Sequence, residues 1–158
     1  MYARVEPELA IRSAVAADLP ALQQVYRAAS LSNAGDAPLL LAQPEYLVFA
    51  GEGITDGRTV VAVAGPTGED QVVGFATLAD GTELEDLFVD PDRRRLGIAR
   101  HLVRQIAATA RQAGHRHLWV TANPHAMAFY LAVGFVRTDQ VSTALGTGLR
   151  MSLDLSQG

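Results

Sequence analysis

The stretch ELEDLFVDPDRRRLGIARHLVRQIA, residues 83–107, decides the fold. Its first part, Leu84 to Val89, is a short run of apolar and acidic residues that is typical of a strand. Pro91 then ends the strand, because proline has no amide hydrogen to give to a sheet. Apolar residues return at helical spacing at 99, 102, 103, 106 and 110. The stretch therefore predicts a strand, a basic loop and the start of a helix.

The junction between this loop and this helix predicts an anion site. The start of a helix presents unpaired amides and the positive end of the helix dipole. Arg93, Arg94 and Arg95 add positive charge, and Gly97 lets a ligand come close to the backbone. Each contact of this kind contributes ~0.3–1 kcal/mol, so several together could hold a pyrophosphate. The spacing alone leaves open a purely structural strand, turn and helix.

Length, composition and charge limit the classes of protein to which the chain can belong. A chain of 158 residues, 49% hydrophobic and 19% charged, fits one globular domain, residues 1–158. No apolar run reaches the roughly 20 residues that span a bilayer, and the first residues lack the apolar core of a secretory signal. There is no cysteine, and the net charge of −4 argues against nucleic-acid binding. We expect a cytoplasmic protein that binds neither nucleic acid nor membrane.

The segments before the central stretch predict a strand, helical pieces and a hairpin. Residues 9–14 form the first strand, and a helix follows with Asp18 as its N-cap. Residues 36–49, interrupted by Pro44, form two short helical pieces or one kinked helix, and the glycine-rich link that follows is a mobile loop. Two strands at 58–64 and 71–79 pair across a turn, and residues 83–89 add a third antiparallel strand.

The segments after it predict two more helices and three more strands. The helix from Leu96 to about Ala113 stops at Gly114, and residues 115–121 form a parallel strand beyond this crossover. A further helix runs from Asn123 and Pro124 to Val133, and residues 135–141 and 148–155 are the last strands. The order predicts an α/β (α+β) domain. Its mixed, mostly antiparallel sheet of about seven strands has helices on both faces.

Two motifs now resemble those of a known family. Arg94-x-x-Gly97-x-Ala99 matches the (Gln/Arg)-x-x-Gly-x-(Gly/Ala) motif of the GNAT superfamily of N-acetyltransferases. Downstream, NPHAMAFYLAVGF at 123–135 resembles the second motif of that family, N-x-x-A-x-x-F-Y-x-x-x-G-F. The motifs occur in the expected order with a strand between them. The order of elements extends the resemblance over nearly the whole chain.

This resemblance implies that the chain binds acetyl-coenzyme A. The loop and helix start would take the pyrophosphate, and the pantetheine arm would run between the fourth and fifth strands, 84–89 and 118–121, which splay apart. The residues that the resemblance assigns to the cofactor are Leu87, Phe88, Val89, Arg94, Arg95, Leu96, Gly97, Ile98, Ala99, Asn123 and Tyr130. Asn123 also has a structural role, since an N-cap before Pro124 is what a helix start needs.

The resemblance also implies an acid for the leaving thiolate, and the strand offers a base. Tyr130 holds the position of the family's proton donor, and a phenol is neutral at pH 7. An alkyl amine arrives protonated, so a base must remove a proton. We expect Glu85 to be that base, with Glu83, Asp86 or a water as alternatives. By strict alternation Glu85 shares a face with Leu87 and Val89, and a bulge would invert this.

The expected function is transfer of an acetyl group from acetyl-coenzyme A to a primary amine in a ternary complex. The acidic residues near Glu85 favour a cationic acceptor, either a small molecule or a peptide. We expect no metal, since no histidines or carboxylates have metal-ligand spacing. A homodimer formed through the last strands is possible. The alternative function is a non-catalytic module that senses acyl-coenzyme A.

Overall fold

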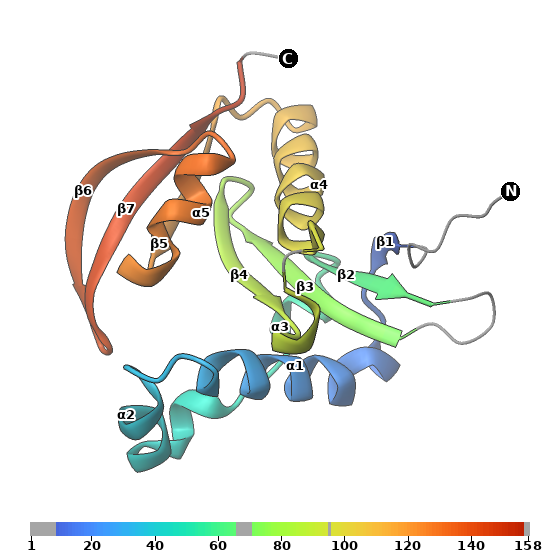
Figure 1. Ribbon diagram of the computed structural model, residues 1–158. Helices are drawn as coiled ribbons and strands as arrows, with labels where there is room; N and C mark the ends of the chain where they lie inside the picture. Colours follow the sequence, from blue (N-terminus) through green and yellow to red (C-terminus); the bar gives the residue numbers. More distant parts are fainter. Residues whose placement is uncertain (1–8, 66–70, 95, 157–158) are drawn as a thin grey trace, which may run out of the picture.

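The computed structural model describes residues 9–65, 71–94 and 96–156, and within them seven strands form one sheet (Figure 1). The strand order is β1-β2-β3-β4-β5-β7-β6. The strands are β1 (Leu9–Ser13), β2 (Thr59–Ala64), β3 (Gln71–Ala79), β4 (Glu83–Val89), β5 (His117–Ala122), β6 (Val136–Thr143) and β7 (Gly146–Asp154). Neighbouring strands are antiparallel except β4 and β5, which are parallel. The predicted mixed sheet is confirmed.

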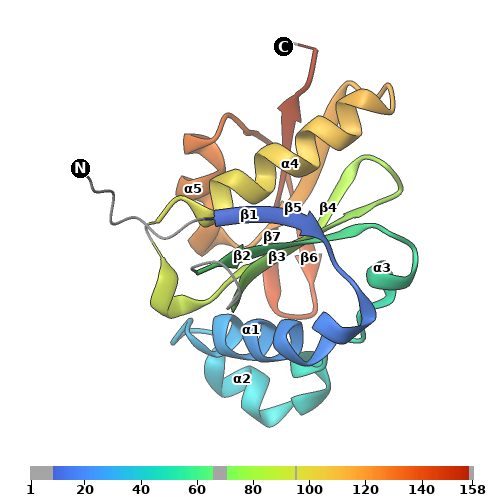
Figure 2. The same ribbon diagram turned by 90° about the vertical axis from the view of Figure 1, so that its right-hand side faces the viewer.

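Helices cover both faces of the sheet, as predicted. Figure 2 shows α4 and α5 on one face and α1 and α2 on the other. The helices are α1 (Leu19–Leu31), α2 (Ala37–Ala42), α3 (Glu52–Thr55), α4 (Ile98–Gln112) and α5 (Met127–Ala132). The crossover from β4 to β5 passes through α4, which is why these two strands run in parallel.

The larger hydrophobic cluster lies between the sheet and the pair α4 and α5. Helix α4 points one apolar stripe at the sheet, and Leu102, Ile106 and Ala110 are almost wholly buried there. Each fully buried leucine or isoleucine contributes about 1.5–3 kcal/mol. A smaller cluster under α1 contains Leu22, Phe49 and Phe75. These two clusters fix β4 between them, because its residues contribute to both.

Some predicted boundaries were wrong by a few residues. The segment 36–49 contains α2 followed by the 3-10 turn Pro44–Leu47, which agrees with two short helical pieces. The link expected to be a loop contains α3, a helix of one turn. Helix α4 begins at Ile98, because Gly97 has a left-handed backbone, φ 79°, and acts as the N-cap. The helix expected from Pro124 begins with a 3-10 turn, Pro124–Ala126, and becomes α-helical at Met127.

In the described part of the chain, no helix combines the length and the apolar character needed to cross a membrane.

Candidate active site

Strand β4 contains a bulge at its acidic end. Thr77 of β3 pairs with Asp86, whereas the next residue, Leu78, pairs with Leu84, so Glu85 is the extra residue. The bulge places Leu84 in the same hydrophobic cluster as Leu87 and Val89, which strict alternation does not allow. Glu85 is exposed and contributes to the wall of the cavity described below.

Strands β4 and β5 meet only at their beginnings. Glu83 and Trp119 are the one register pair between them in the described chain. The amide of Trp119 donates to the carbonyl of Thr82 over 2.8 Å. Beyond this point the strands diverge, as predicted, and the stretch of β4 from Leu87 to Val89 faces a gap in the sheet.

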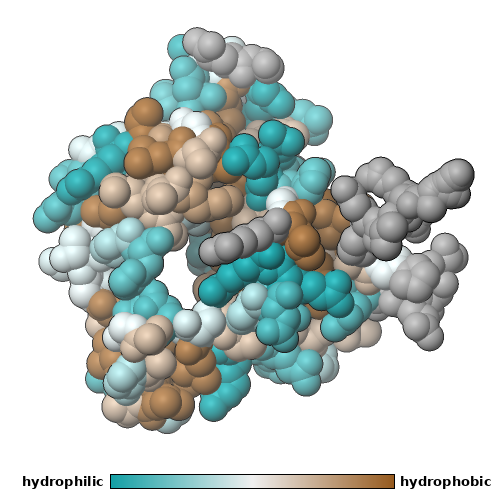
Figure 3. Space-filling view, in the orientation of Figure 1, coloured by the Kyte–Doolittle hydropathy of each residue, from teal (hydrophilic) through white to brown (hydrophobic). Residues whose placement is uncertain are grey.

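A cavity of about 1140 Å³ occupies this gap. Figure 3 shows the molecule hollowed at its centre, between the lobe that carries α1 and α2 and the lobe that carries β5 to β7. The cavity is lined by the end of α1 and the linker after it, by β4, by the start of α4, by the end of β5 and by the turn between β6 and β7. Among the predicted cofactor residues, those that line it are Leu87, Phe88, Val89, Arg94, Gly97, Ile98, Ala99, Asn123 and Tyr130.

The start of α4 opens into this cavity. A Cβ atom built on Gly97 would meet only the ring of His101, at 3.9 Å, so the approach to the helix start is open. Arg94 is exposed and donates a hydrogen bond to the hydroxyl of Ser32. Leu96 is 55% exposed and lies outside the cavity wall, unlike the other predicted residues of this loop that the structure describes. Arg95 lies outside the described residues.

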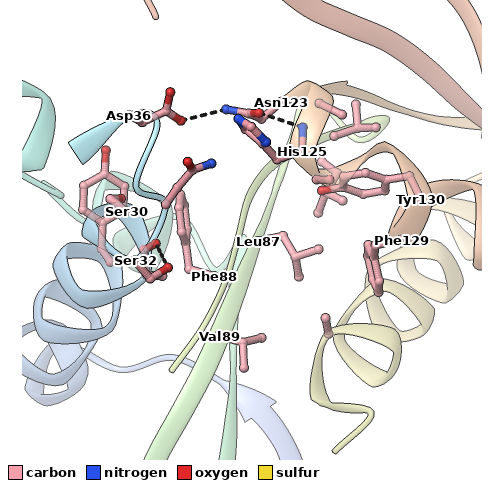
Figure 4. A pocket seen from close by; sticks show the side chains of 18 of the residues that line it. Ser30, Ser32, Asp36, Leu87, Phe88, Val89, Asn123, His125, Phe129 and Tyr130 are labelled. Atoms are coloured by element: carbon pink, nitrogen blue, oxygen red, sulfur yellow. Dashed lines mark hydrogen bonds between the residues drawn. The ribbon is translucent and has the colours of Figure 1, made fainter. Parts of the chain in front are cut away.

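Asn123 performs the structural role expected of it and a second one. Its Oδ1 accepts the amide of His125 over 2.9 Å, which caps the turn at Pro124. Its Nδ2 donates to Oδ2 of Asp36 over 2.9 Å, across the cavity (Figure 4). Asp36 immediately precedes α2, so this bond joins the two lobes.

Tyr130 lies in the cavity wall with its ring buried. The ring packs against Phe129 and Phe135, with centroids 5.1 Å and 5.2 Å away. The hydroxyl end points toward the cavity in Figure 4. Burial raises the pKa of Tyr130, so the hydroxyl keeps its proton throughout the physiological range.

The three acidic residues of β4 have different surroundings. Glu83 is held by Arg150 of β7 in a two-bond ion pair. Glu85 lies 3.5 Å from Arg58, and its side chain is 53% exposed. Burial raises the pKa of Asp86 to about 6, although a hydrogen bond with Thr77 lowers it. Asp86 lies on the α1 side of the sheet, where its charge adds to the effect of burial in raising the pKa of Tyr26.

Sequence reasoning missed the contribution of the α1–α2 linker. Ser32 and Asp36 contact Arg94 and Asn123, the two polar motif residues, from the opposite side of the cavity. No motif marks these linker residues, and the partners are 62 and 87 positions apart in the chain. Only the folded arrangement brings them together.

Comparison with known proteins shows the family to which this fold belongs. A family model described as an acetyltransferase (GNAT) domain matches residues 50–153. The chain therefore belongs to the GNAT family. No curated protein sequence matches it significantly.

Solved structures share the whole fold at low sequence identity. A GCN5-related N-acetyltransferase from Rhodopseudomonas palustris is 19% identical, with a TM-score of 0.72, and covers 98% of this chain and 99% of its own. The PaiA N-acetyltransferase from Thermoplasma acidophilum, solved with coenzyme A, is 16% identical, with a TM-score of 0.71, and covers 93% and 99%. The ribosomal-protein-S18-alanine N-acetyltransferase from Escherichia coli is 22% identical, with a TM-score of 0.64, and covers 96% of each chain.

Proposed function

We propose that this protein is an N-acetyltransferase that uses acetyl-coenzyme A. The observation that supports this most directly is the cavity running from the start of α4 along the gap between β4 and β5. A relative with the same fold, PaiA from Thermoplasma acidophilum, was solved in complex with coenzyme A. An elongated ligand with a phosphate at one end and an apolar arm fits such a cavity.

The residues at the start of α4 fit the pyrophosphate. The first amides of α4 have no partner within the helix, and the dipole of the helix favours negative charge there. Gly97 leaves space beside these amides, and Arg94 supplies a guanidinium at the cavity. By resemblance to the family, we assign the backbone amides of Arg95, Leu96, Ile98 and Ala99 to the same contact.

Strand β4 fits the pantetheine arm. After Glu83 it has no register pair with β5 in the described chain, so Leu87 to Val89 can pair with the amides of the arm instead. The side chains of Leu87 and Val89 pack on the larger cluster, and Phe88 packs under α1. These three side chains hold the edge of β4 in place, and the backbone of the strand would contact the pantetheine arm.

Two side chains in the cavity wall would move protons. Acetyl-coenzyme A supplies an acetyl group activated as a thioester. Glu85 takes a proton from the acceptor ammonium, directly or through water, and the freed amine forms the new carbon–nitrogen bond as the carbon–sulfur bond breaks. The hydroxyl of Tyr130 passes a proton to the departing sulfur and takes back the second proton that the nitrogen loses as the amide forms, so coenzyme A leaves as a neutral thiol and Tyr130 ends protonated. The raised pKa of Tyr130 makes it a persistent hydrogen-bond donor in this role.

The acceptor is a cationic primary amine, either a small molecule or a peptide. The cavity wall includes the carboxylates of Asp36 and Glu85 and the aromatic side chains of Tyr26 and Tyr46. Carboxylates attract an ammonium, and aromatic faces stabilise a cation by about 0.5–2 kcal/mol.

The test uses the purified chain, acetyl-coenzyme A and a panel of diamines, aminoglycosides, arylalkylamines and peptides. Binding is measured by calorimetry, and turnover is measured as thiol released from coenzyme A. We expect micromolar binding and turnover with at least one cationic amine. Binding without any turnover would favour the alternative, a non-catalytic sensor of acyl-coenzyme A. Absence of binding would refute both.

A further inference from the structure

The sheet consists of two halves that share a narrow junction. Strands β1 to β4 form one half, and β5, β7 and β6 form the other. Between them the described chain has one register pair, Glu83 with Trp119. Two hydrogen bonds support it: the Trp119 amide to the Thr82 carbonyl, 2.8 Å, and the Thr82 hydroxyl to the His117 carbonyl, 2.5 Å. Such a junction alone leaves the angle between the halves weakly determined.

Arg150 links the two halves at this junction. It lies on β7, which is separated from β4 by β5, and its side chain reaches over β5 to Glu83. Its Nη1 donates to Oε2 of Glu83 over 2.6 Å, and its Nη2 donates to Oε1 over 2.7 Å. This is a two-bond, charge-assisted geometry, which is both strong and directional. Arg150 and Glu83 are each less than a third exposed, so water screens the pair only in part.

The guanidinium is also fixed from below and from the side. It lies over the ring of Trp119, with its central carbon 5.2 Å from the ring centroid. Its Nη1 also donates to the hydroxyl of Thr121 over 3.1 Å. Lysine could not make these contacts together, because it lacks the planar fork of donors. We call Arg150, Glu83, Trp119 and Thr121 the clasp.

The clasp lies where the cavity begins. Thr121 belongs to the clasp and to the cavity wall, and Leu84 and Glu85, next along β4 from Glu83, also line the cavity. A change in the angle between the halves at the clasp is therefore enlarged along β4, toward Leu87 and Val89. The gap that receives the pantetheine arm would change in width.

From this geometry we propose that Arg150 is a positioning residue: the clasp holds β4 and β5 at the separation that coenzyme A requires. This inference rests on the proposed function. Without the clasp, the halves are still joined by the larger hydrophobic cluster and by the Asp36–Asn123 bond. They then sample a wider range of angles, and a smaller fraction of molecules presents the correct gap. The apparent dissociation constant then rises in inverse proportion to that fraction.

The experiment compares clasp variants with a matched ion pair elsewhere. Arg150→Met keeps the length of the side chain and removes the clasp, and Arg150→Lys keeps only its charge. The control is Arg12→Met, because Arg12 makes a similar two-bond pair with Asp18, at 2.8 Å and 3.0 Å, on the far edge of the sheet. The readouts are the affinity for coenzyme A, the melting temperature and the fluorescence of Trp119, the only tryptophan of the chain.

We expect Arg150→Met to weaken binding of coenzyme A by roughly tenfold, within the 5- to 150-fold range of typical conformational coupling. The affinity of Arg150→Lys for coenzyme A should lie between those of Arg150→Met and the wild type. Arg12→Met should lower the melting temperature without changing the affinity. The double variant Glu83→Gln/Arg150→Met should bind no worse than Arg150→Met alone, because both changes break the same link. The emission of Trp119 should shift in both Arg150 variants and stay constant in Arg12→Met.

Unchanged affinity in Arg150→Met, or a further loss of affinity in the double variant relative to Arg150→Met, would overturn the proposal. If the wild type itself fails to bind coenzyme A, the proposed function is wrong. Amide hydrogen exchange then tests separately whether the clasp links the two halves. The Trp119 amide, which crosses the junction, should exchange faster in Arg150→Met than in the wild type. Equal exchange rates would refute the clasp as a link between the halves.

Discussion

Tyr130 combines a buried ring with a hydroxyl that points toward the cavity. We predict that Tyr130→Phe lowers kcat by about 100-fold or more, the lower end of the usual range for a lost proton donor. The affinity for coenzyme A should change little, because the ring contacts with Phe129 and Phe135 remain. Steady-state kinetics and calorimetry on the same preparation separate the two effects. Full activity of the variant would remove Tyr130 from the mechanism.

The raised pKa of Asp86 predicts that the stability of the protein depends on pH. Its pKa in the folded protein is about 6, above the reference value of 3.8, so the folded state binds its proton more tightly than the unfolded state does. Stability from this group is therefore fully present below pH 4 and is lost as the pH rises through 6. Between these two pH ranges, the contribution of Asp86 to the free energy of unfolding falls by about 3 kcal/mol at most.

The variant Asp86→Asn isolates this effect. It keeps a polar partner for Thr77 and carries no charge, so we expect it to melt at a higher temperature than the wild type at pH 7.5. The two proteins should melt at similar temperatures near pH 4. Glu45→Gln is the control, because the Glu45 side chain is exposed and its charge is not among those that shift the pKa of Asp86. A constant difference between Asp86→Asn and the wild type across pH 4 to 8 would contradict this account.

At the scale of elements, the start of α4 can be tested with a matched pair of variants. Gly97→Asn and Gly97→Asp have the same shape, and each costs about 1 kcal/mol for the left-handed backbone. Only Asp adds a negative charge beside the helix start. We expect Gly97→Asp to bind coenzyme A at least about tenfold more weakly than Gly97→Asn, since like charges 4 Å apart repel by up to about 4 kcal/mol. Equal affinities would remove the pyrophosphate from this helix start.

The sequence predicted those elements in which the spacing of apolar residues follows a regular period. Helix α4 has buried residues at Leu102, Val103 and Ile106, a spacing that a helix brings onto one face and a strand does not. The strand, loop and helix around Gly97 could also be predicted, because proline and glycine restrict or free the backbone at their own positions, whatever the rest of the fold. The bulge at Glu85 was not, because one extra residue in a short run of mixed residues leaves no mark in the alternation.

The contacts that cross the cavity could not be predicted for a different reason. Asp36 and Asn123 each occupy the N-cap position of a helical element, where a polar residue is ordinary. Their pairing depends on how α2 and β5 are placed in space, which neither segment specifies by itself. The same holds for Glu83 and Arg150, 67 positions apart.

At the scale of the whole molecule, ligand binding should stabilise the fold by mass action. Coenzyme A at 100 times its dissociation constant adds about 2.7 kcal/mol. Because the proposed site takes both the phosphates and the arm, pantetheine at the same concentration should raise the melting temperature much less than coenzyme A. Differential scanning fluorimetry measures both ligands. An equal shift for the two would place the affinity in the arm alone.

The bond between Asp36 and Asn123 makes the protein a closed ring around its own cavity. The lobes meet at the junction of β4 and β5 and again at this bond, so a ligand longer than the cavity must be threaded or the ring must open. A hydrogen bond to a charged group contributes about 1.5–3 kcal/mol, so this bond is broken in roughly 0.6 to 7 per cent of the molecules at any moment. Thermal motion therefore breaks and re-forms the Asp36–Asn123 bond, and each opening would give the nucleotide of the proposed cofactor a side entrance to the cavity.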